Sequence, residues 1–367
     1  MNGKNNTIRA AGDNLPVPSV LTAMSGGVDS SAACVLLKEQ GFTCGGATMI
    51  MFNSENIDAA SPQDDARSVC VQLGIPFYVF DFTELFHKTV IEHFVASYQK
   101  ALTPNPCVFC NRFLKFERFL KKADELNYDF IATGHYVRKE YDAAADRYLL
   151  KKAADAAKDQ SYVLYALTQE QLRRSLFPLG GFQKSETRNL AEKYDLMNAQ
   201  RRESQDICFI PDGDYAGFIE RCTGKQWADG DFINTEGKKV GVHRGLIRYT
   251  IGQRKGLGIA DKTPYYVKKF DIPNNTVILC KIDELYSSSL EAADINLIPF
   301  ARIDKPLRCK AKIRYRQVEK PAVVEQIAED RIRVIFDEPQ KAITAGQAVV
   351  LYDGDVVLGG GTIITET

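Results

Sequence analysis

Residues 19–40, SVLTAMSGGVDSSAACVLLKEQ, decide the fold of the N-terminal part of this chain. The apolar run Val20–Met24 is typical of a buried strand, and the pattern through Val35–Leu37 is typical of a helix. Between them lies Ser25–Ser31, which reads SGGVDSS. Glycines let the backbone approach a phosphate closely, serine hydroxyls donate hydrogen bonds, and a helix N-terminus adds exposed amides. The stretch therefore predicts a strand, an anion-binding turn and a helix.

This loop is not a Walker loop, because no Gly-Lys-Ser or Gly-Lys-Thr follows it. Two glycines alone would favour an ordinary tight turn capped by Asp29 and Ser30, but the whole heptad stands here between a strand and a helix. It resembles the loop of the N-type ATP pyrophosphatases. The resemblance implies a loop that holds the pyrophosphate of ATP, an aspartate that acts through Mg²⁺, and adenylation of a carbonyl oxygen. It leaves the substrate open among amides, ureido groups and nucleobases.

The composition is that of a folded protein with more than one domain. The chain has 367 residues, 45% apolar and 26% charged, which predicts two to three domains and excludes disorder, collagen and a coiled-coil rod. Lysine plus arginine balances aspartate plus glutamate, 47 against 47, so nucleic acid could be bound only through local patches. Nine cysteines at irregular spacings do not indicate a disulfide framework. Without a long apolar stretch or a signal-peptide core, we expect a cytoplasmic protein that does not bind membranes.

The spacing of apolar residues and the positions of turn residues divide the chain into a tail and three parts. Between residues 15 and 135, apolar strand-like runs alternate with helical patterns, which predicts an α/β fold with a parallel sheet. Beyond Pro264, short strands with turns at Asn274-Asn275 and Asp353-Gly354 predict a small β-barrel or sandwich. The predicted parts are a polar tail (1–14), a parallel-sheet domain (15–205), a small basic module (206–282) and a C-terminal β-barrel (283–367).

Two cysteines are candidates for chemistry. Cys110 closes a Cys-x-x-Cys pair in the proline-rich segment 103–111, before a helix that we expect to begin near Arg112. A thiol at a helix N-terminus is stabilised as the nucleophilic thiolate. The pair could also be redox-active, bind a metal or simply pack. Cys208, taken alone, indicates a buried cysteine in an apolar strand.

The order of several segments along the chain is more specific than any one motif. Together they resemble the tRNA-specific 2-thiouridylases, and the similarity covers all but the N-terminal tail. The segments are the loop at Ser25, the Pro-Asn-Pro run at residues 104–106, Ala132–Tyr136, Lys158–Tyr162, Ser204–Ile210, Gly252–Gly258, Arg314–Arg316 and Ala345–Gln347.

The resemblance implies an N-terminal HUP-like ATP-pyrophosphatase domain and a defined reaction. ATP would adenylate the C2 oxygen of the wobble uridine, and sulfur carried as a persulfide on Cys208 would displace AMP. Cys110 would then form a disulfide with Cys208 as sulfur is released. The sulfur would come from a persulfide-donating sulfurtransferase or a cysteine desulfurase.

The same resemblance assigns binding residues. The nucleotide contacts would be Ala23, Met24, Ser25, Gly26, Gly27, Val28, Asp29, Ser30, Met49 and Gly134. The target base would be held by Asn105, Pro106 and Cys107. The remaining tRNA contacts would be His135, Lys158, Asp159, Gln160, Arg314, Tyr315 and Gln347.

This chain departs from the family pattern at two places. Cys107 stands where the family usually has an aspartate, and Met49 is followed by Ile50-Met51-Phe52 instead of Lys-x-Trp. The third cysteine suggests the hypothesis that Cys107, Cys110 and Cys208 ligate an iron-sulfur cluster whose open iron binds sulfide.

Two basic segments suggest contact with RNA. Every second residue from Arg308 to Arg316 is basic, and in a strand this places five cations on one face about 6.8 Å apart. A solvated edge strand normally needs fewer charges, so a row that follows phosphates is favoured. Residues 237–260 contain no acidic residue, and Tyr249 is there a candidate for stacking on a base.

Two other functions fit parts of the sequence. A pyrophosphatase-loop ligase acting on a small molecule would need the loop but not the basic segments. A catalytically silent tRNA-binding paralogue would explain the two departures, but not the retention of the loop with Cys110 and Cys208.

Overall fold

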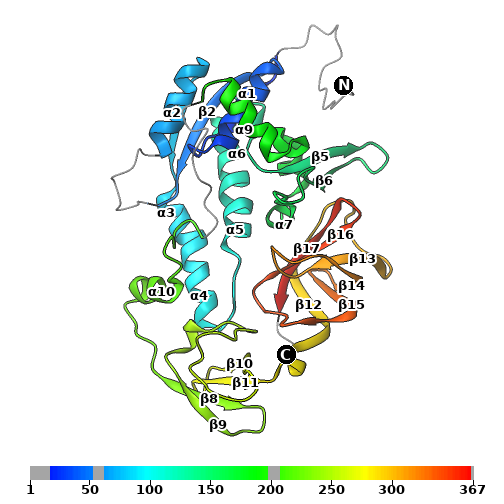
Figure 1. The fold of residues 1–367 in the computed structure, drawn as a ribbon. Coiled ribbons are helices and arrows are strands. Elements are labelled where there is room, and N and C mark those ends of the chain that lie inside the picture. Colours follow the sequence, from blue (N-terminus) through cyan, green and yellow to red (C-terminus); the bar gives the residue numbers. More distant parts are fainter. Residues whose placement is uncertain (1–16, 53–61, 197–206, 365–367) are drawn as a thin grey trace. The chain divides into compact units, whose positions relative to one another are not determined.

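The computed structural model describes residues 17–52, 62–196 and 207–364 (Figure 1). The chain divides into two compact units. The first unit contains residues up to His87, Cys110–Glu203 and Asp355–Val357. The second contains Lys88–Phe109, Ser204–Gly354 and the chain from Leu358 onward. No helix in the described ranges is long and apolar enough to cross a membrane.

A five-stranded parallel sheet forms the centre of the first unit, as the alternating pattern predicts. Its order is β3-β2-β1-β4-β7, and each neighbouring pair runs parallel. Strand β2 had no counterpart among the segments recognised in the sequence. The strands are β1 (Ser19–Ala23), β2 (Thr43–Ile50), β3 (Phe77–Asp81), β4 (Phe130–Ala132) and β7 (Ser175–Leu176).

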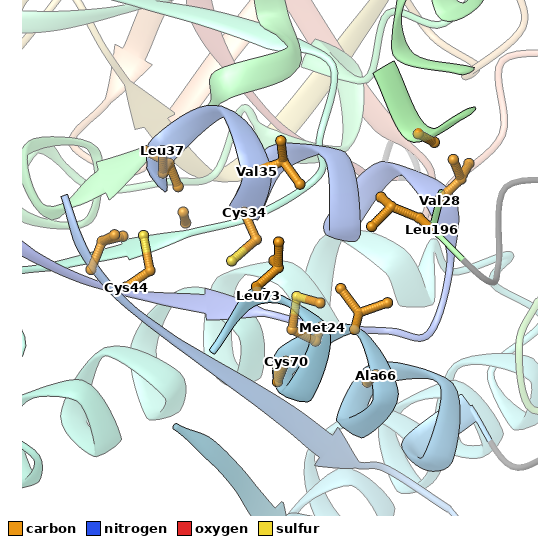
Figure 2. Packing of buried hydrophobic residues seen from close by; sticks show 14 of the residues in the cluster. Met24, Val28, Cys34, Val35, Leu37, Cys44, Ala66, Cys70, Leu73 and Leu196 are labelled. Atoms are coloured by element: carbon orange, nitrogen blue, oxygen red, sulfur yellow. The ribbon is translucent and has the colours of Figure 1, made fainter. Parts of the chain in front are cut away.

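Helices cover the sheet and bury its apolar residues. The helices α1 (Val28–Glu39), α2 (Pro62–Leu73) and α9 (Lys184–Lys193) contribute to one core cluster with β1 and β2, shown in Figure 2. The cluster holds the cysteines Cys34, Cys44 and Cys70, and burial raises the pKa of the Cys70 thiol to about 11. Away from this cluster, Phe80 of β3 packs edge-on against Phe119 at 6.2 Å between ring centroids.

A long helical run begins earlier than predicted. It consists of α5 (Pro106–Phe109), a π-helical segment (Cys110–Arg118) and α6 (Phe119–Glu125). Proline is favoured as the first residue of a helix, since its fixed φ suits the helix and its missing N–H would be unpaired there anyway. The helix therefore starts at Pro106 and not near Arg112, and Cys110 lies one turn inside it. The expectation of Cys110 at a helix N-terminus is wrong.

The rest of the first unit is a hairpin and short helices. Gln183 caps α9 through a reciprocal pair of hydrogen bonds with Glu186. Val356 pairs with Lys151 of the hairpin. The elements are β5 (Val137–Asp142), β6 (Arg147–Lys152), α7 (Ser161–Leu164), α8 (Gln169–Arg174) and the 3₁₀ turn Pro178–Gly181.

The second unit begins with a helical segment and a four-stranded sheet. Helices in Lys88–Phe109 include α4 (Glu92–Gln99), which follows α3 (Thr83–Phe86) and the π-helical segment His87–Ile91. The sheet order is β10-β11-β8-β9, with α10 (Tyr215–Thr223) preceding it. Its strands are β8 (Gly230–Asn234), β9 (Lys239–His243), β10 (Tyr266–Asp271) and β11 (Thr276–Cys280), and 3₁₀ turns span Leu246–Arg248 and Ile282–Leu285.

Tyr249 is part of the core of this sheet and does not serve as a stacking platform. Only 8% of the residue is exposed, and its ring lies edge-on to Phe232 at 5.2 Å. Its hydroxyl accepts a hydrogen bond from the backbone N–H of Arg244 at 3.2 Å. The prediction of a stacking role is wrong because burying the apolar ring in the core stabilises the fold more than leaving it exposed would.

The C-terminal part is a closed six-stranded antiparallel barrel, which resolves the choice between barrel and sandwich. The order β12-β15-β14-β13-β16-β17 is closed by pairing of β12 with β17. The Asp353-Gly354 turn joins β16 to β17 as expected. The strands are β12 (Tyr286–Leu297), β13 (Leu307–Lys312), β14 (Lys320–Ala328), β15 (Arg331–Lys341), β16 (Ala348–Asp353) and β17 (Val356–Ile364).

The predicted row of five cations is shorter than expected. Strand β13 ends at Lys312, so Arg314 and Arg316 lie in the turn that follows. Arg308 on the strand pairs with Asp337, its Nη1 lying 2.7 Å from Oδ1. The prediction of five cations in one continuous row along a strand is therefore wrong.

Candidate functional site

The SGGVDSS segment forms a turn at the carboxyl end of β1, ahead of helix α1. Gly26 has φ of +72°, and Gly27 is the N-cap residue of α1. Ser30 Oγ accepts from the Ser25 N–H at 3.2 Å and donates to the Gly27 carbonyl at 2.9 Å. Glycine has no side chain that could cap the helix, so the first amides of α1 remain suited to an anion.

Two predicted nucleotide contacts point their side chains into the core. Met24 and Val28 are 2% and 4% exposed and belong to the cluster in Figure 2. The Met24 backbone is held by β2, since its N–H donates to Ala47 O and its carbonyl accepts from Thr48 Oγ1, both at 2.8 Å. Met49 lies near the end of β2, at the same edge of the sheet. Such an edge is where open parallel sheets bind ligands.

The carboxylate of Asp29 is held by a buried lysine that the sequence analysis missed. Lys184 Nζ lies 2.6 Å from Asp29 Oδ1 and 2.8 Å from Oδ2, and Lys184 is only 8% exposed. The Tyr136 hydroxyl donates to the same Oδ1 at 2.8 Å and lies 3.0 Å from Thr187 Oγ1. A lysine in the first turn of a helix opposes the helix dipole, and this was the available signal that Lys184 has a specific partner.

Gly134 brings the turn after β4 against the loop. A Cβ atom at this position would lie 2.8 Å from both the carbonyl carbon of Asp29 and the nitrogen of Ser30. Only glycine allows two backbones to approach so closely. The structure thus joins Gly134 to the predicted nucleotide contacts.

His135 follows in the same turn and is held neutral. Its Nδ1 lies 2.8 Å from Thr133 Oγ1, and its ring packs beside Phe116 at 5.8 Å between centroids. Although part of the residue reaches solvent, burial of the imidazole and the nearby charge of Lys115 lower the pKa of His135 to about 3. His135 can therefore offer RNA a hydrogen bond but not a positive charge.

The segment 158–160 lies beside this turn, and two of its side chains are engaged within the protein. Gln160 Oε1 accepts from the Tyr136 N–H at 2.9 Å. The carboxylate of Asp159 accepts from the Ala153 N–H at 3.0 Å and from Ser161 Oγ at 2.7 Å. These contacts connect the predicted tRNA-binding segment to Tyr136 and so to Asp29.

The cysteines are distributed between the two units. Cys110 is buried in the first unit, while Cys107 and Cys208 are exposed in the second. Cys208 lies in a turn and not in the strand expected for it. Its neighbour Phe209 is buried edge-on to Phe94 at 5.4 Å between ring centroids, which anchors the turn and leaves the thiol outside.

The predicted base-holding residues begin helix α5. Asn105 Oδ1 accepts from the Cys107 N–H at 3.2 Å, and Pro106 is buried. On the barrel, Tyr315 is 40% exposed, whereas Arg314 and Gln347 donate to backbone carbonyls of the same unit. Within the described residues no three His, Cys, Asp or Glu side chains are grouped closely enough to hold a metal ion.

Three protein families match successive parts of the chain. The family described as the tRNA methyl transferase HUP domain matches residues 18–212. The tRNA methyl transferase PRC-barrel domain matches residues 216–281, and the aminomethyltransferase beta-barrel domain matches residues 287–363.

Curated relatives share one description. The tRNA-specific 2-thiouridylase MnmA of Acetivibrio thermocellus is 48% identical over 353 residues, covering 94% of this chain and 98% of that protein. The protein of that name from Clostridioides difficile is 44% identical over 351 residues, covering 94% and 97%. A solved 4-thiouridine synthetase in complex with RNA and bound ATP is 18% identical with a TM-score of 0.37, covering 53% of this chain and 46% of that one.

The contact between Lys184 and Asp29 predicts a stability effect. Lys184→Met should lower the free energy of unfolding by about 1–3 kcal/mol, because it leaves a partly buried carboxylate without its cation. Lys184→Met combined with Asp29→Asn should cost less than the sum of the single changes. Urea unfolding of the three variants measures this. Arg173→Met, which breaks an exposed pair with Glu170, is the matched control and should change stability by no more than about 0.5 kcal/mol. Additive costs would contradict the coupling.

The pKa of His135 predicts a dependence of stability on pH. The pKa is lowered from 6.5 to about 3 in the fold, so below pH 6.5 the unfolded chain binds a proton that the folded chain does not. Stability is therefore lost as the pH falls from 7 to 5, by roughly 2 kcal/mol from this group. Urea unfolding at both pH values should show this loss in wild type and a smaller loss in His135→Asn. Equal losses in the two proteins would refute the assignment.

Proposed function

Since this chain belongs to the tRNA-specific 2-thiouridylase family and is an ATP-using tRNA sulfurtransferase, we propose that it thiolates the wobble uridine at C2 in two chemical steps. The observation that supports this most is the geometry of the SGGVDSS turn, whose helix N-terminus, Gly134 contact and anchored Asp29 suit the phosphates of ATP. We place the reaction in the cytoplasm.

The first step activates the base. The C2 oxygen of the uridine attacks the α-phosphorus of ATP, pyrophosphate leaves, and the oxygen becomes part of a good leaving group. The amides at the start of α1 hold the phosphates. Asp29 is the residue that would hold Mg²⁺, which when bound neutralises charge on the departing pyrophosphate. Because Lys184 and Tyr136 already fix Asp29, the carboxylate is oriented before the nucleotide arrives.

The second step transfers sulfur from Cys208. The terminal sulfur of a Cys208 persulfide attacks C2 and AMP leaves with the electron pair of the C–O bond. The Cys110 thiolate then attacks the inner sulfur, which releases 2-thiouridine and leaves a Cys110–Cys208 disulfide for a dithiol to reduce. Exposure of Cys208 supports the loading step, because a sulfur-donating desulfurase or sulfurtransferase must reach the thiol. Burial of Cys110 supports its role as the thiol that attacks last, since burial protects it from premature reaction.

The cluster route remains a second candidate because of Cys107. It requires the thiolates of Cys107, Cys110 and Cys208 around one metal centre. The persulfide route needs only Cys110 and Cys208, and no step in it depends on Cys107.

Nucleoside analysis tests the proposal directly. Unmodified tRNA incubated with the protein, ATP, Mg²⁺ and a persulfide donor should yield 2-thiouridine, detected by mass spectrometry. Cys110→Ser and Cys208→Ser should each retain less than about 1% of the wild-type rate, since each removes one partner of a sequential transfer. Cys222→Ser, which removes another exposed thiol of the second unit, is the matched control and should keep full activity.

The same assay separates the other functions. Cleavage of ATP to AMP that requires tRNA but gives no thiolation would retain activation and exclude the sulfur route. Cleavage without dependence on tRNA would favour a small-molecule ligase. Absence of both activities would favour a silent tRNA-binding protein.

Visible spectroscopy tests the cluster route. We expect anaerobically purified wild type to be colourless and fully active with a persulfide donor. Broad visible absorbance that disappears in Cys107→Ser, together with loss of thiolation in that variant, would instead support the iron-sulfur cluster.

A further inference from the structure

One loop of the barrel holds the segment that precedes the base-holding residues. We call residues 342–347 the barrel clamp. Its Ala345 carbonyl accepts from the Thr103 N–H at 2.9 Å. The side chain of Gln347 donates from Nε2 to the Thr103 carbonyl at 2.8 Å and lies 3.4 Å from the Pro104 carbonyl. All of these residues belong to the second unit.

The clamp approaches this segment backbone to backbone. Gly346 has φ of +89°, and a Cβ atom there would lie 2.9 Å from Thr103 N and 3.0 Å from its carbonyl carbon and oxygen. No other residue fits without displacing Thr103. The contact is therefore built into the backbone and does not depend on a flexible side chain alone.

Arg314 supports the other end of the clamp. Its Nη2 donates to the Ala342 carbonyl at 2.7 Å and lies 3.3 Å from Thr344 Oγ1, and Thr344 is buried. Ala342 itself adopts φ of +53°, a conformation that needs such support in a residue other than glycine. Arg314 and Gln347, both predicted from the family resemblance to contact tRNA, thus use hydrogen-bond donors within the protein. Arg314 holds the clamp, and Gln347 joins the clamp to Thr103.

We propose that Gln347 is a positioning residue: through its hydrogen bond to Thr103, it fixes the position of the base-holding segment Asn105–Cys107 relative to the barrel. The inference rests on the proposed function, in which that segment holds the target uridine. Pro104 and Pro106 have fixed φ and are both buried, so a shift at Thr103 is passed on to Asn105 instead of being absorbed. A displacement of about 1 Å at a substrate-holding group can cost about 100-fold in rate.

A direct tRNA contact by Gln347 would have different consequences. The carboxamide nitrogen faces the carbonyls of Thr103 and Pro104, which leaves Oε1 as the group available to RNA. Loss of an RNA contact weakens tRNA binding, whereas loss of positioning slows turnover of tRNA that is already bound.

Hydrogen exchange tests the proposal without tRNA or ATP. Gln347→Leu keeps the size of the side chain but removes both donors. We expect the Thr103 and Asn105 amides to exchange about tenfold faster, the worth of roughly one hydrogen bond. Gln326→Leu is the matched control, because Gln326 also donates from the barrel to a carbonyl, that of Glu329 at 3.0 Å, and it should leave these amides unchanged.

Thiolation kinetics provide the second readout. For Gln347→Leu we expect the rate at saturating tRNA to fall by about tenfold or more, while the Kd for tRNA stays within about threefold of wild type. Unchanged exchange at both amides, or a raised Kd with an unchanged saturated rate, would overturn the proposal. If Gln347→Leu does not fold, Gln347→Met, which also lacks both donors, is measured in the same way. Faster exchange in a protein whose wild type does not thiolate would refute the proposed function and leave the positioning role intact.

Discussion

The carboxylate of Asp29 joins three parts of the first unit that are far apart in the sequence. It sits on the turn before α1, accepts from Tyr136 after β4, and pairs with Lys184 at the start of α9. A buried ammonium group is tolerated only with a partner, so each of these elements constrains the other two. The shape of the turn at Ser25–Ser31 therefore depends on the whole unit and not on the SGGVDSS sequence alone.

In the second unit, too, a contact between distant segments fixes a short stretch of chain, here through uncharged groups. The barrel clamp forms hydrogen bonds with the N–H and the carbonyl of Thr103, and the close approach of the two backbones requires glycine at position 346. The division of the chain reflects this, since Lys88–Phe109 groups with the C-terminal barrel although the SGGVDSS turn precedes it and Cys110 follows it in the first unit. The segment proposed to hold the nucleotide and the segment proposed to hold the base thus belong to different units.

Local patterns predicted the parallel sheet, the loop and the barrel, because the spacing of apolar residues and the turn residues can be read from neighbouring positions in the sequence. They failed where distant contacts decide the outcome. Lys184 lies 155 residues from Asp29, and Gln347 lies 244 residues from Thr103, so neither partner could be read from spacing. The burial of Tyr249 against Phe232 likewise depends on pairing within the sheet. The early start of the helix at Pro106 was a local error, since the preference of proline for the first helical position was available.

The burial of cysteines in the cores bears on the fidelity of sulfur transfer. Burial raises the pKa of Cys70 and Cys280 to about 11 and that of Cys309 to about 12, so these thiols remain protonated at neutral pH. A protonated thiol is a poor nucleophile toward a persulfide. The buried thiols of Cys70, Cys280 and Cys309 are therefore poor acceptors of persulfide sulfur, whereas the thiol of Cys208 is exposed to a donor.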